Sequence, residues 1–343
     1  MLTRLGCSIF FSAALVFFSL PACAADWKTY QQTFVSPDGR VTDFFQNSIS
    51  HSEGQGYGLL LALMNGDRSA FERIFKWTTD NLQVRRDALF AWSWGRRTND
   101  GWNVIDYNNA SDGDILIAFA LLKAADRWGH PPFREAGLRI IRDIRGHLAV
   151  KVDDFHLIAP AYFGFNGQTG NVFNTGYLVL PAFSAFAQID DEAFWKRTLR
   201  DSQRLLQKAV FSRLKVPPDW IALENGQVTI AAARSPFFGY EAIRAPLYLS
   251  WHGNGDMLAA FGDYLHFIER TGYLPNRVNL VDGTVAVEEA PAGFHAVMGL
   301  CAQRLGRNGL AQKLFQDADS KIGREPKDYY SNSLFLMATG KLD

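Results

Sequence analysis

Residues 110–128, with the sequence A-S-D-G-D-I-L-I-A-F-A-L-L-K-A-A-D-R-W, combine carboxylates with a long apolar run. Ser111 and Asp114 have the spacing of a capping box, in which two side chains at a helix start bond free backbone N–H groups. Asp112 lies between them and has no part in that pattern. A carboxylate without a capping role at the start of an apolar helix is a candidate for acid–base chemistry.

A second predicted helix start repeats this arrangement. Ser52 and Gln55 have capping-box spacing and enclose Glu53. Because two surplus acids occupy equivalent places on two helices, we expect Glu53 and Asp112 to share one site. The positive end of a helix dipole favours ionised carboxylates, so a general acid there needs burial or a neighbouring carboxylate to keep its proton. Asp112 is the expected neighbour.

Three glycines follow Glu53 at alternate positions. Gly54, Gly56 and Gly58 lie in the first turns of the predicted helix, where each costs about 1 kcal/mol relative to alanine. Two interpretations remain open. Either a neighbouring helix packs closely against the bare backbone, or a ligand approaches the backbone beside Glu53.

A third acidic motif lies in residues 237–248. Glu241 and Arg244 are three residues apart and are expected to share a helix face beside Tyr240. On an exposed helix this pair would be a surface salt bridge of small effect. The surrounding residues are mainly aromatic and aliphatic, which favours burial and therefore a functional site.

The sequence offers no pattern typical of metal or cofactor chemistry. Its seven histidines show no His-Glu-x-x-His spacing and have no cysteine partner, so no zinc site is expected. A Gly-x-Ser-x-Gly elbow, a phosphate-binding loop and a dinucleotide fingerprint are also absent. Paired carboxylates and abundant aromatic residues remain, and these are the groups that a glycoside hydrolase uses.

The composition favours an uncharged partner. Lys and Arg number 35, as do Asp and Glu, so no net charge would attract nucleic acid or anionic lipid. Of the 343 residues, 14% are aromatic, and flat apolar rings with polar edges are suited to stacking against sugars. A neutral carbohydrate is the expected partner.

Residues 1–24 have the features of a signal peptide, with an early positive charge, a short apolar run and small residues before the expected cleavage site. The mature chain would begin near Ala25 as a periplasmic or secreted protein without a membrane span. Lipidation of Cys23, in a sequence similar to a lipoprotein box, is the alternative. Cleavage removes Cys7 and Cys23 and leaves Cys301 alone, so no intramolecular disulfide is expected.

Most of the remaining chain has apolar residues at helical spacing. Strand-like alternation is confined to short stretches such as 227–231 and 285–287, which predict ribbons in loops. We predict an all-α single domain over residues 25–343, with about a dozen helices paired in a closed ring whose inner helices are apolar all round. The clearest helical segments are 55–64, 68–81, 114–128, 133–148, 174–187, 192–211, 237–250, 255–269 and 293–304.

These motifs resemble those of glycoside hydrolase family 8, a family of bacterial endoglucanases that includes periplasmic cellulases associated with cellulose synthesis. Residues 110–128 resemble the family signature A-[S/T]-D-[A/G]-D before an apolar helix, and residues 52–58 resemble the motif with the general acid. The resemblance implies an (α/α)6 barrel with an open cleft, which hydrolyses β-1,4-glucan with inversion and without metal or cofactor. Further similarities lie at residues 92–94, 160–163, 217–220 and 329–330.

The resemblance also implies roles for the acids. Glu53 matches the general acid, and Asp112 matches the residue that holds and distorts the sugar beside the scissile bond. Much of the family has its base in a Tyr-Asp-Ala-x-Arg motif, where this chain has Glu241 in place of aspartate. One extra methylene moves the carboxylate by about a bond length, which can cost much rate. We take Glu241 as the base, with Asp112 and Asp106 as alternatives.

Substrate contacts are expected from Trp94, Tyr162, Tyr240, Arg244 and Tyr330. The implied partner is a β-glucan polysaccharide, with a functional link to cellulose synthase machinery and a monomeric protein as further expectations. Two alternatives stay open. The same acids could hydrolyse chitosan, xylan or mixed-linkage glucan, or the chain could be a weakly active glucan-binding component of a cellulose export assembly.

Overall fold

The computed structural model describes residues 25–98, 101–167 and 170–342. The predicted signal peptide, with Cys7 and Cys23, lies outside the described residues. Within the described part of the chain, Cys301 is buried with a free thiol, and no helix is long and apolar enough to cross a membrane.

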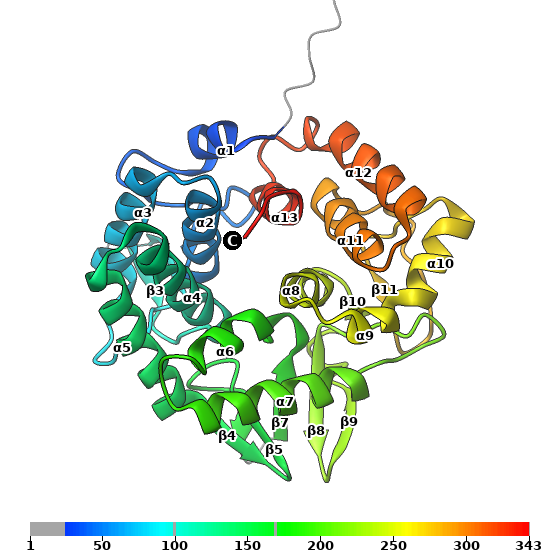
Figure 1. Ribbon diagram of the computed structural model, residues 1–343, viewed down its shortest axis with the longest axis horizontal. Coiled ribbons are helices and arrows are strands. Elements are labelled where there is room, and N and C mark those ends of the chain that lie inside the picture. Colours follow the sequence, from blue (N-terminus) through cyan, green and yellow to red (C-terminus); the bar gives the residue numbers. More distant parts are fainter. Residues whose placement is uncertain (1–24, 99–100, 168–169, 343) are drawn as a thin grey trace, which may run out of the picture.

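Six helices form an inner ring (Figure 1). Each inner helix contacts the next one along the chain, and the last returns to contact the first, so the ring is closed. These helices are α2 (Ser52–Met64), α4 (Ser111–Trp128), α6 (Leu180–Phe186), α8 (Arg244–His252), α11 (Ala292–Arg304) and α13 (Tyr329–Thr339).

A second layer of helices surrounds this ring, and each inner helix packs against an outer one. The predicted (α/α)6 barrel is therefore confirmed. The outer helices are α1 (Trp27–Phe34), α3 (Arg68–Leu82), α5 (Pro131–Leu148), α7 (Glu192–Lys208), α9 (Gly255–Leu258), α10 (Gly262–Thr271) and α12 (Asn308–Ile322), with the 3₁₀ turn η2 (Ala259–Phe261) between α9 and α10.

Inner and outer helices differ in burial as their positions require. Nearly every residue of α2 and α4 is buried, including the polar residues of their first turns. The outer helix α3 instead buries one stripe, in which Phe71, Ile74 and Thr78 recur at helical spacing. Polar groups at the inner helix starts therefore have to find partners within the protein.

Short antiparallel ribbons join the helices. One of them, β9, matches the strand predicted at 227–231, whereas residues 285–287 form no strand, and Val285 makes only an isolated bridge to Val278. The sheets are β1 (Ser50–His51), β2 (Ser93–Arg97) and β3 (Gly101–Asp106); β4 (Ala149–Val152) and β5 (Phe155–Ile158); β6 (Asn166–Gly167), β7 (Gly170–Asn174), β8 (Trp220–Glu224) and β9 (Gln227–Ile230); and β10 (Phe237–Phe238) and β11 (Val278–Asn279).

Two inner helices begin several residues later than predicted. α6 starts at Leu180 and α8 at Arg244. Pro181 and Pro246 lie in the first turns of these helices, where a backbone N–H has no intrahelical partner to lose. Farther inside a helix each proline would remove a hydrogen bond, so the preceding residues adopt other conformations. Glu241 is among them.

Candidate active site

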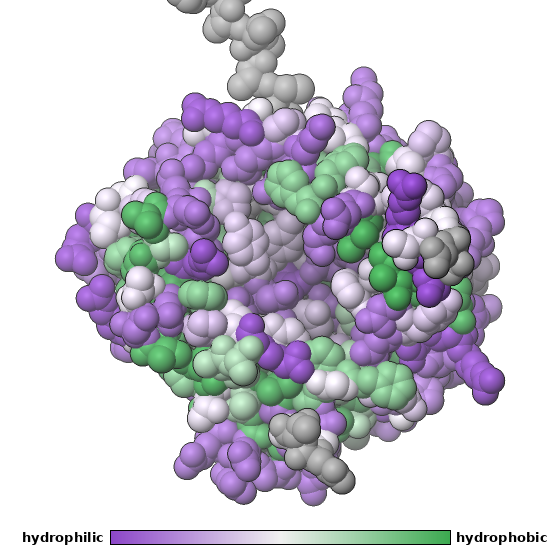
Figure 2. Space-filling view, turned by 180° about the vertical axis from the view of Figure 1, so that it is seen from behind, coloured by the Kyte–Doolittle hydropathy of each residue, from purple (hydrophilic) through white to green (hydrophobic). Residues whose placement is uncertain are grey.

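A cavity of about 290 Å³ opens at one end of the inner ring, where Figure 2 shows a hollow in the middle of the face. Its walls come from the first turns of inner helices and from the loops before them. Distant parts of the chain therefore converge on one concave site. The lining residues are Gln46, His51, Ser52, Glu53, Trp92, Ala110, Asp112, Tyr177, Tyr240, Glu241, Arg244 and Tyr330.

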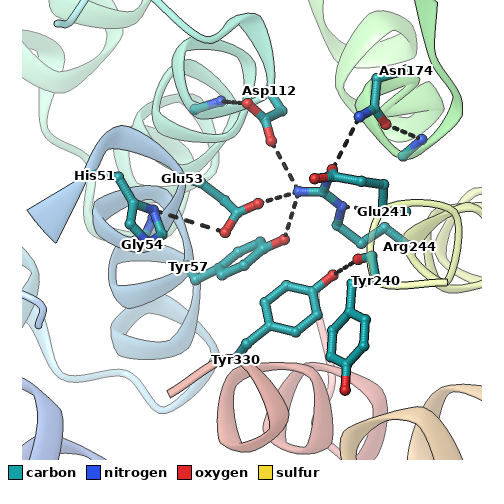
Figure 3. A network of polar contacts seen from close by, with 12 residues as sticks. His51, Glu53, Gly54, Tyr57, Asp112, Asn174, Tyr240, Glu241, Arg244 and Tyr330 are labelled. Carbon is teal, nitrogen blue, oxygen red and sulfur yellow. Dashed lines mark hydrogen bonds and ion pairs between the residues drawn. The ribbon is translucent and has the colours of Figure 1, made fainter. Parts of the chain in front are cut away.

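Arg244 is the centre of the polar network at this cavity (Figure 3). Its side chain is only 1% exposed. Nη1 donates hydrogen bonds to Glu53 and, at 2.9 Å, to Asp112, and Nη2 donates to Glu241. The structure thus brings the three acids singled out in the sequence to one shared cation.

Three carboxylates share a single positive charge here, so full ionisation would leave two net negative charges. Burial raises the pKa of Asp112 to about 8, with Arg244 opposing the rise and the carboxylates of Glu53 and Glu241 adding to it. Burial also raises the pKa of Glu241, again against the attraction of Arg244. The cluster therefore favours keeping a proton near neutral pH, as a general acid requires.

The first turns of α2 and α4 lie backbone against backbone. A Cβ atom at Gly113 would lie 2.2 Å from Ser52 Oγ, and one at Gly56 would lie 2.9 Å from Leu116 Cβ. Glycine at both positions lets the helices approach and brings their acids to the same cation. Of the two interpretations of the glycines, close helix packing is the one that the structure supports at Gly56.

The capping box predicted for α2 does not form. The helix is capped by His51, whose Nδ1 accepts a hydrogen bond of 3.1 Å from the backbone N–H of Gly54. Gln55 instead accepts from the N–H of Val41 and donates to Thr78 Oγ1. Because the helix start is buried, the Gln55 side chain forms hydrogen bonds with polar groups of neighbouring segments, which are also shielded from water.

The capping box predicted for α4 is also wrong. No side chain caps this helix, and the N–H of Ser111 donates to the carbonyl of Pro160 at 2.8 Å. Asp114 accepts hydrogen bonds from Phe90 N at 2.9 Å and from Asn109 Nδ2 at 2.7 Å. Its carboxylate thereby holds the loops beside the helix start rather than the helix itself.

Glu53 is held by partners other than Arg244. The hydroxyl of Tyr329 donates to Glu53 Oε1 at 3.2 Å, and His51 Nδ1 lies 3.8 Å from the same oxygen. His51 Nε2 lies 3.5 Å from Asp43 Oδ2. Because Nδ1 accepts a backbone hydrogen bond, the neutral ring carries its proton on Nε2, where it faces Asp43. Asp43 therefore orients the residue that caps the Glu53 helix.

Glu241 lies in residues 239–243 and not on a helix face shared with Arg244 as predicted. We call this turn the base turn, after the role that the sequence leads us to expect for Glu241. The two residues still meet, because Arg244 also donates to the Glu241 carbonyl at 3.3 Å. Asn174 Nδ2 donates to the Glu241 carboxylate at 3.0 Å. A Cβ atom at Gly176 would lie 2.1 Å from the Glu241 carbonyl oxygen, so this approach requires glycine.

Asp219 holds the base turn from the other side. Its carboxylate accepts hydrogen bonds from the backbone N–H groups of Gly239, Glu241 and Ala242 at 3.1, 3.1 and 2.9 Å. Ser235 Oγ donates to its second oxygen at 2.7 Å. A single buried side chain thus fixes the backbone that carries Glu241.

Two of the residues predicted to contact the substrate, Tyr240 and Tyr330, lie next to each other at the cavity wall. Tyr240 and Tyr330 both line the cavity, and the Tyr330 hydroxyl donates to the Tyr240 carbonyl (Figure 3). The side chain of Tyr240 is half exposed. Its ring is therefore accessible to a ligand in the cavity.

Trp94 and Tyr162 lie elsewhere. The Trp94 ring stacks on Trp102 with centroids 5.3 Å apart and meets Trp77 edge-on, and it does not line the cavity. Tyr162 is exposed and packs edge-on against Phe163. Substrate binding by Trp94 and Tyr162 stays a prediction.

Sequence reasoning did not select several residues of the site, among them Trp92, Tyr177 and Asn174. Trp92 and Tyr177 line the cavity, and Asn174 binds Glu241. A local signal existed for Asn174, because its Oδ1 accepts from Gly176 N in an Asx turn that opens the 3₁₀ turn η1 (Thr175–Tyr177). No sequence signal distinguishes Trp92 from Trp94 in the same W-S-W motif.

The chain resembles proteins of known kind over almost its whole length. It matches the model of glycosyl hydrolases family 8 over residues 4–342. It is 32% identical to a probable endoglucanase of Novacetimonas hansenii over 322 residues, which cover 92% of this chain and 90% of the relative.

Solved structures agree with that match. An endo-β-1,4-glucanase of Acetobacter xylinum superposes with a TM-score of 0.79 and 31% identity, covering 91% of this chain and 95% of the other. Endoglucanase Cel10 of Klebsiella pneumoniae, a family 8 glycosyl hydrolase, gives a TM-score of 0.80 at 30% identity, with 91% and 96% coverage. The chain therefore belongs to glycosyl hydrolases family 8.

Proposed function

We propose that this protein is an inverting endo-β-1,4-glucanase that hydrolyses cellulose or a related β-glucan. The observation that carries the proposal is a cavity in which Arg244 binds Glu53 and Glu241 through its two terminal nitrogens. Two carboxylates facing one cavity are what glycoside hydrolysis requires. The endoglucanase names of the relatives, which match along nearly their full length, support the substrate class.

Glu53 is the proposed general acid. It protonates the glycosidic oxygen of the leaving sugar, a step that a positioned carboxylic acid within hydrogen-bond reach performs. Asp112 is the most buried of the three acids, at 1% exposed, and it shares Arg244 with Glu53. We assign Asp112 to holding the sugar beside the scissile bond.

Glu241 is the proposed base, which removes a proton from the water that attacks the sugar from the opposite face. Its side chain is 37% exposed, against 19% for Glu53 and 1% for Asp112, so it has the best access to water. Asp106 is less suited, because it accepts from Trp92 Nε1 at 2.8 Å and does not line the cavity.

The longer side chain of glutamate at this position has partners that suit it. Asn174 binds the carboxylate at 3.0 Å, and Arg244 binds the same oxygen. Gly176 allows the backbone of the base turn to approach closely from behind. These contacts support the idea that the backbone compensates for the extra methylene of Glu241.

The substrate is proposed to be a neutral glucan chain. Tyr240, Trp92 and Tyr330 present aromatic surface at the cavity, and sugar rings stack against such surfaces. Among the lining residues, Arg244 already binds three carboxylates. A neutral sugar therefore needs no charged partner beyond those present.

The decisive experiment measures release of reducing ends from carboxymethylcellulose and from chitosan by the purified chain and by Glu53→Gln. Glu224→Gln, which changes an exposed acid at the end of β8, is the matched control. We expect cleavage of carboxymethylcellulose by the parent and the control, and none by Glu53→Gln. The first product detected by NMR should be the α-anomer, as inversion requires.

Other outcomes would change the proposal in defined ways. Cleavage of chitosan alone would move the substrate while keeping the acids. Binding of cellulose without cleavage would favour a glucan-binding component of an export assembly. Unchanged activity in Glu53→Gln would remove the proposed acid.

The base is tested separately with Glu241→Gln and Glu241→Asp. A loss of about 10²–10⁴-fold in Glu241→Gln is expected of a general base. Glu241→Asp should keep part of the activity, because aspartate titrates like glutamate. Full activity in Glu241→Gln would exclude this residue and return attention to Asp106.

Export to the periplasm or the medium, a monomeric state and a link to cellulose synthesis complete the proposal. The features of residues 1–24 support export. Cell fractionation with an intact and a deleted leader tests it. Retention of the intact chain in the cytoplasm would contradict it.

A further inference from the structure

Asp219 has an unusual set of partners for a buried acid. It is 6% exposed, and its hydrogen-bond partners among the described residues are three backbone N–H groups and the Ser235 hydroxyl. In the described part of the chain, no lysine, arginine or histidine nitrogen lies within ion-pair distance of the Asp219 carboxylate. Its charge is therefore balanced by dipoles and not by a cation.

All three N–H groups belong to the base turn, and one is that of Glu241 itself. Pro246 allows α8 to begin only at Arg244, so these N–H groups have no helical partners. A buried N–H without an acceptor costs about 1–3 kcal/mol. Asp219 supplies that acceptor for the three residues that set the direction of the Glu241 side chain.

We infer that Asp219 is a positioning residue for the base, which fixes the base turn and places a carboxylate behind Glu241. This inference rests on the proposed function, because it assumes that Glu241 is the base. Asp219 does not line the cavity. It acts through the backbone that it binds and through its field.

The charge of Asp219 acts on Glu241 together with several others. Burial raises the pKa of Glu241, and the charges of Glu53 and Asp219 add to the rise, whereas Arg244 and the Asn174 hydrogen bond oppose it. Asp112 shares Arg244 from α4. Tyr177 and Tyr330 line the same cavity as neutral hydroxyls.

The ionisation of Asp219 follows from its partners. Burial raises the pKa of Asp219, and the N–H groups of Ala242, Glu241 and Gly239 together with the Ser235 hydroxyl oppose that rise. Hydrogen bonds donated to a carboxylate stabilise its ionised form, so these four donors favour the charge that burial opposes. A second carboxylate near the base makes the base a stronger proton acceptor.

Asp219→Asn removes the negative charge of this side chain while it can keep its hydrogen bonds to the base turn. The amide oxygen can accept the same three N–H bonds, and the amide nitrogen can donate to the Ser235 hydroxyl, which is free to rotate. Removing the negative charge makes ionised Glu241 less costly, so its pKa falls. The acid limb of the profile of kcat/KM against pH should therefore move to lower pH, by about half a unit to one unit.

The experiment compares that limb for the parent enzyme, Asp219→Asn and Asp201→Asn on carboxymethylcellulose. Asp201 is the control, because it is a buried acid on α7 that accepts a backbone N–H from His156 but lies outside the cavity. Thermal unfolding of each variant shows that it is folded. Loss of a merely structural contact would lower the unfolding temperature without moving the limb.

Ser235→Ala gives a second measurement if Asp219→Asn does not fold. It removes one of the four donors around the Asp219 carboxylate and leaves the backbone bonds in place. The less shielded charge should move the acid limb to higher pH, opposite to the shift in Asp219→Asn. Shifts of opposite sign cannot come from a common loss of stability.

Failure of this inference is distinguishable from failure of the proposed base. An inactive Glu241→Gln together with an unmoved limb in folded Asp219→Asn would overturn the role of Asp219 and keep the base. Full activity in Glu241→Gln would overturn the base itself. An inactive Glu241→Gln with a lowered limb in Asp219→Asn, and an unmoved limb in Asp201→Asn, is the expected result.

Discussion

The two halves of the site are built in different ways. On the acid side, the first turns of α2 and α4 lie backbone against backbone inside the core, and Glu53 leaves a regular helix. On the base side, Glu241 leaves an irregular turn that Asp219 and Asn174 hold by hydrogen bonds. Helix packing sets the geometry of one acid, and a few polar contacts set that of the other.

This difference bears on Glu241, where the family resemblance leads us to expect aspartate. A position fixed by close helix packing cannot accept an extra methylene without strain. A turn held by hydrogen bonds can shift by a fraction of an ångström while its bonds persist. The comparison predicts that changes in the residues that position Glu53 appear mainly as lost stability, and changes in those that position Glu241 mainly as lost rate.

The largest effect should come from Arg244, which joins the two halves. Arg244→Met leaves Glu53, Asp112 and Glu241 without their cation, so the free energy of unfolding should fall by about 3–5 kcal/mol. The free energy of unfolding of Arg244→Lys should lie between those of Arg244→Met and the parent, because an ammonium group keeps the charge but cannot reproduce the forked geometry of the guanidinium.

Urea unfolding at neutral pH measures the loss, with Arg213→Met as the control for an exposed arginine. A stability of Arg244→Met equal to that of the control would mean that the acids relax into solvent. The two halves would then be independent of each other.

A pair of glycine substitutions tests the comparison directly. In Gly176→Ala the new Cβ would lie 2.1 Å from the Glu241 carbonyl oxygen, so the base turn must move and kcat should fall by about 10²-fold. In Gly113→Ala the Cβ would lie 2.8 Å from the backbone of Ser52, so the core must open, at about 1–3 kcal/mol. Thermal unfolding and steady-state kinetics of both variants provide the measurement. Equal losses of stability and of kcat in the two variants would remove the distinction between the halves.

The sequence predicted the acid side better than the base side, for a physical reason. Glu53 and Asp112 were selected from a local pattern, a helix start before an apolar run. A local pattern of this kind is retained in the folded structure. The predicted capping boxes do not form, because Gln55 and Asp114 bind partners that only the folded surroundings bring near. Packing between distant segments overrides local capping rules.

The base side depends on contacts that are remote in sequence. Asp219 and Asn174 lie 22 and 67 residues from Glu241, and no local pattern joins them. Pro246 was the available clue, since proline favours the first turn of a helix and therefore places Glu241 before α8. The paired helices of the ring were predictable because apolar periodicity is a local property.

An intermediate effect is expected from Asp112 on the acid side. Its pKa of about 8 in the folded chain compares with about 3.9 for an unfolded aspartate. The folded chain therefore binds this proton more tightly, and the stability from it is full below about pH 4 and is lost as the pH rises towards 8.

Asp112→Asn cannot ionise, so its stability relative to the parent should increase from pH 5 to pH 8, by up to a few kcal/mol at about 1.4 kcal/mol per pKa unit. Urea unfolding at the two pH values measures this difference. A difference that is the same at both would show that Asp112 is ionised throughout, and the acid side would then depend on Arg244 as strongly as the base turn does.

The smallest effect should come from His51, and it tests whether helix structure alone holds the acid side. His51→Ala removes the cap of α2 and should cost about 1 kcal/mol, whereas His51→Asn should cost little because asparagine caps helices well. His130→Ala is the control, since His130 precedes α5 without a side-chain cap bond. Thermal unfolding resolves differences of this size. If His51→Asn proved as costly as His51→Ala, the contacts of the His51 ring with Tyr329 and Asp43 would hold the helix start. The acid side would then depend on a few contacts, just as the base turn does.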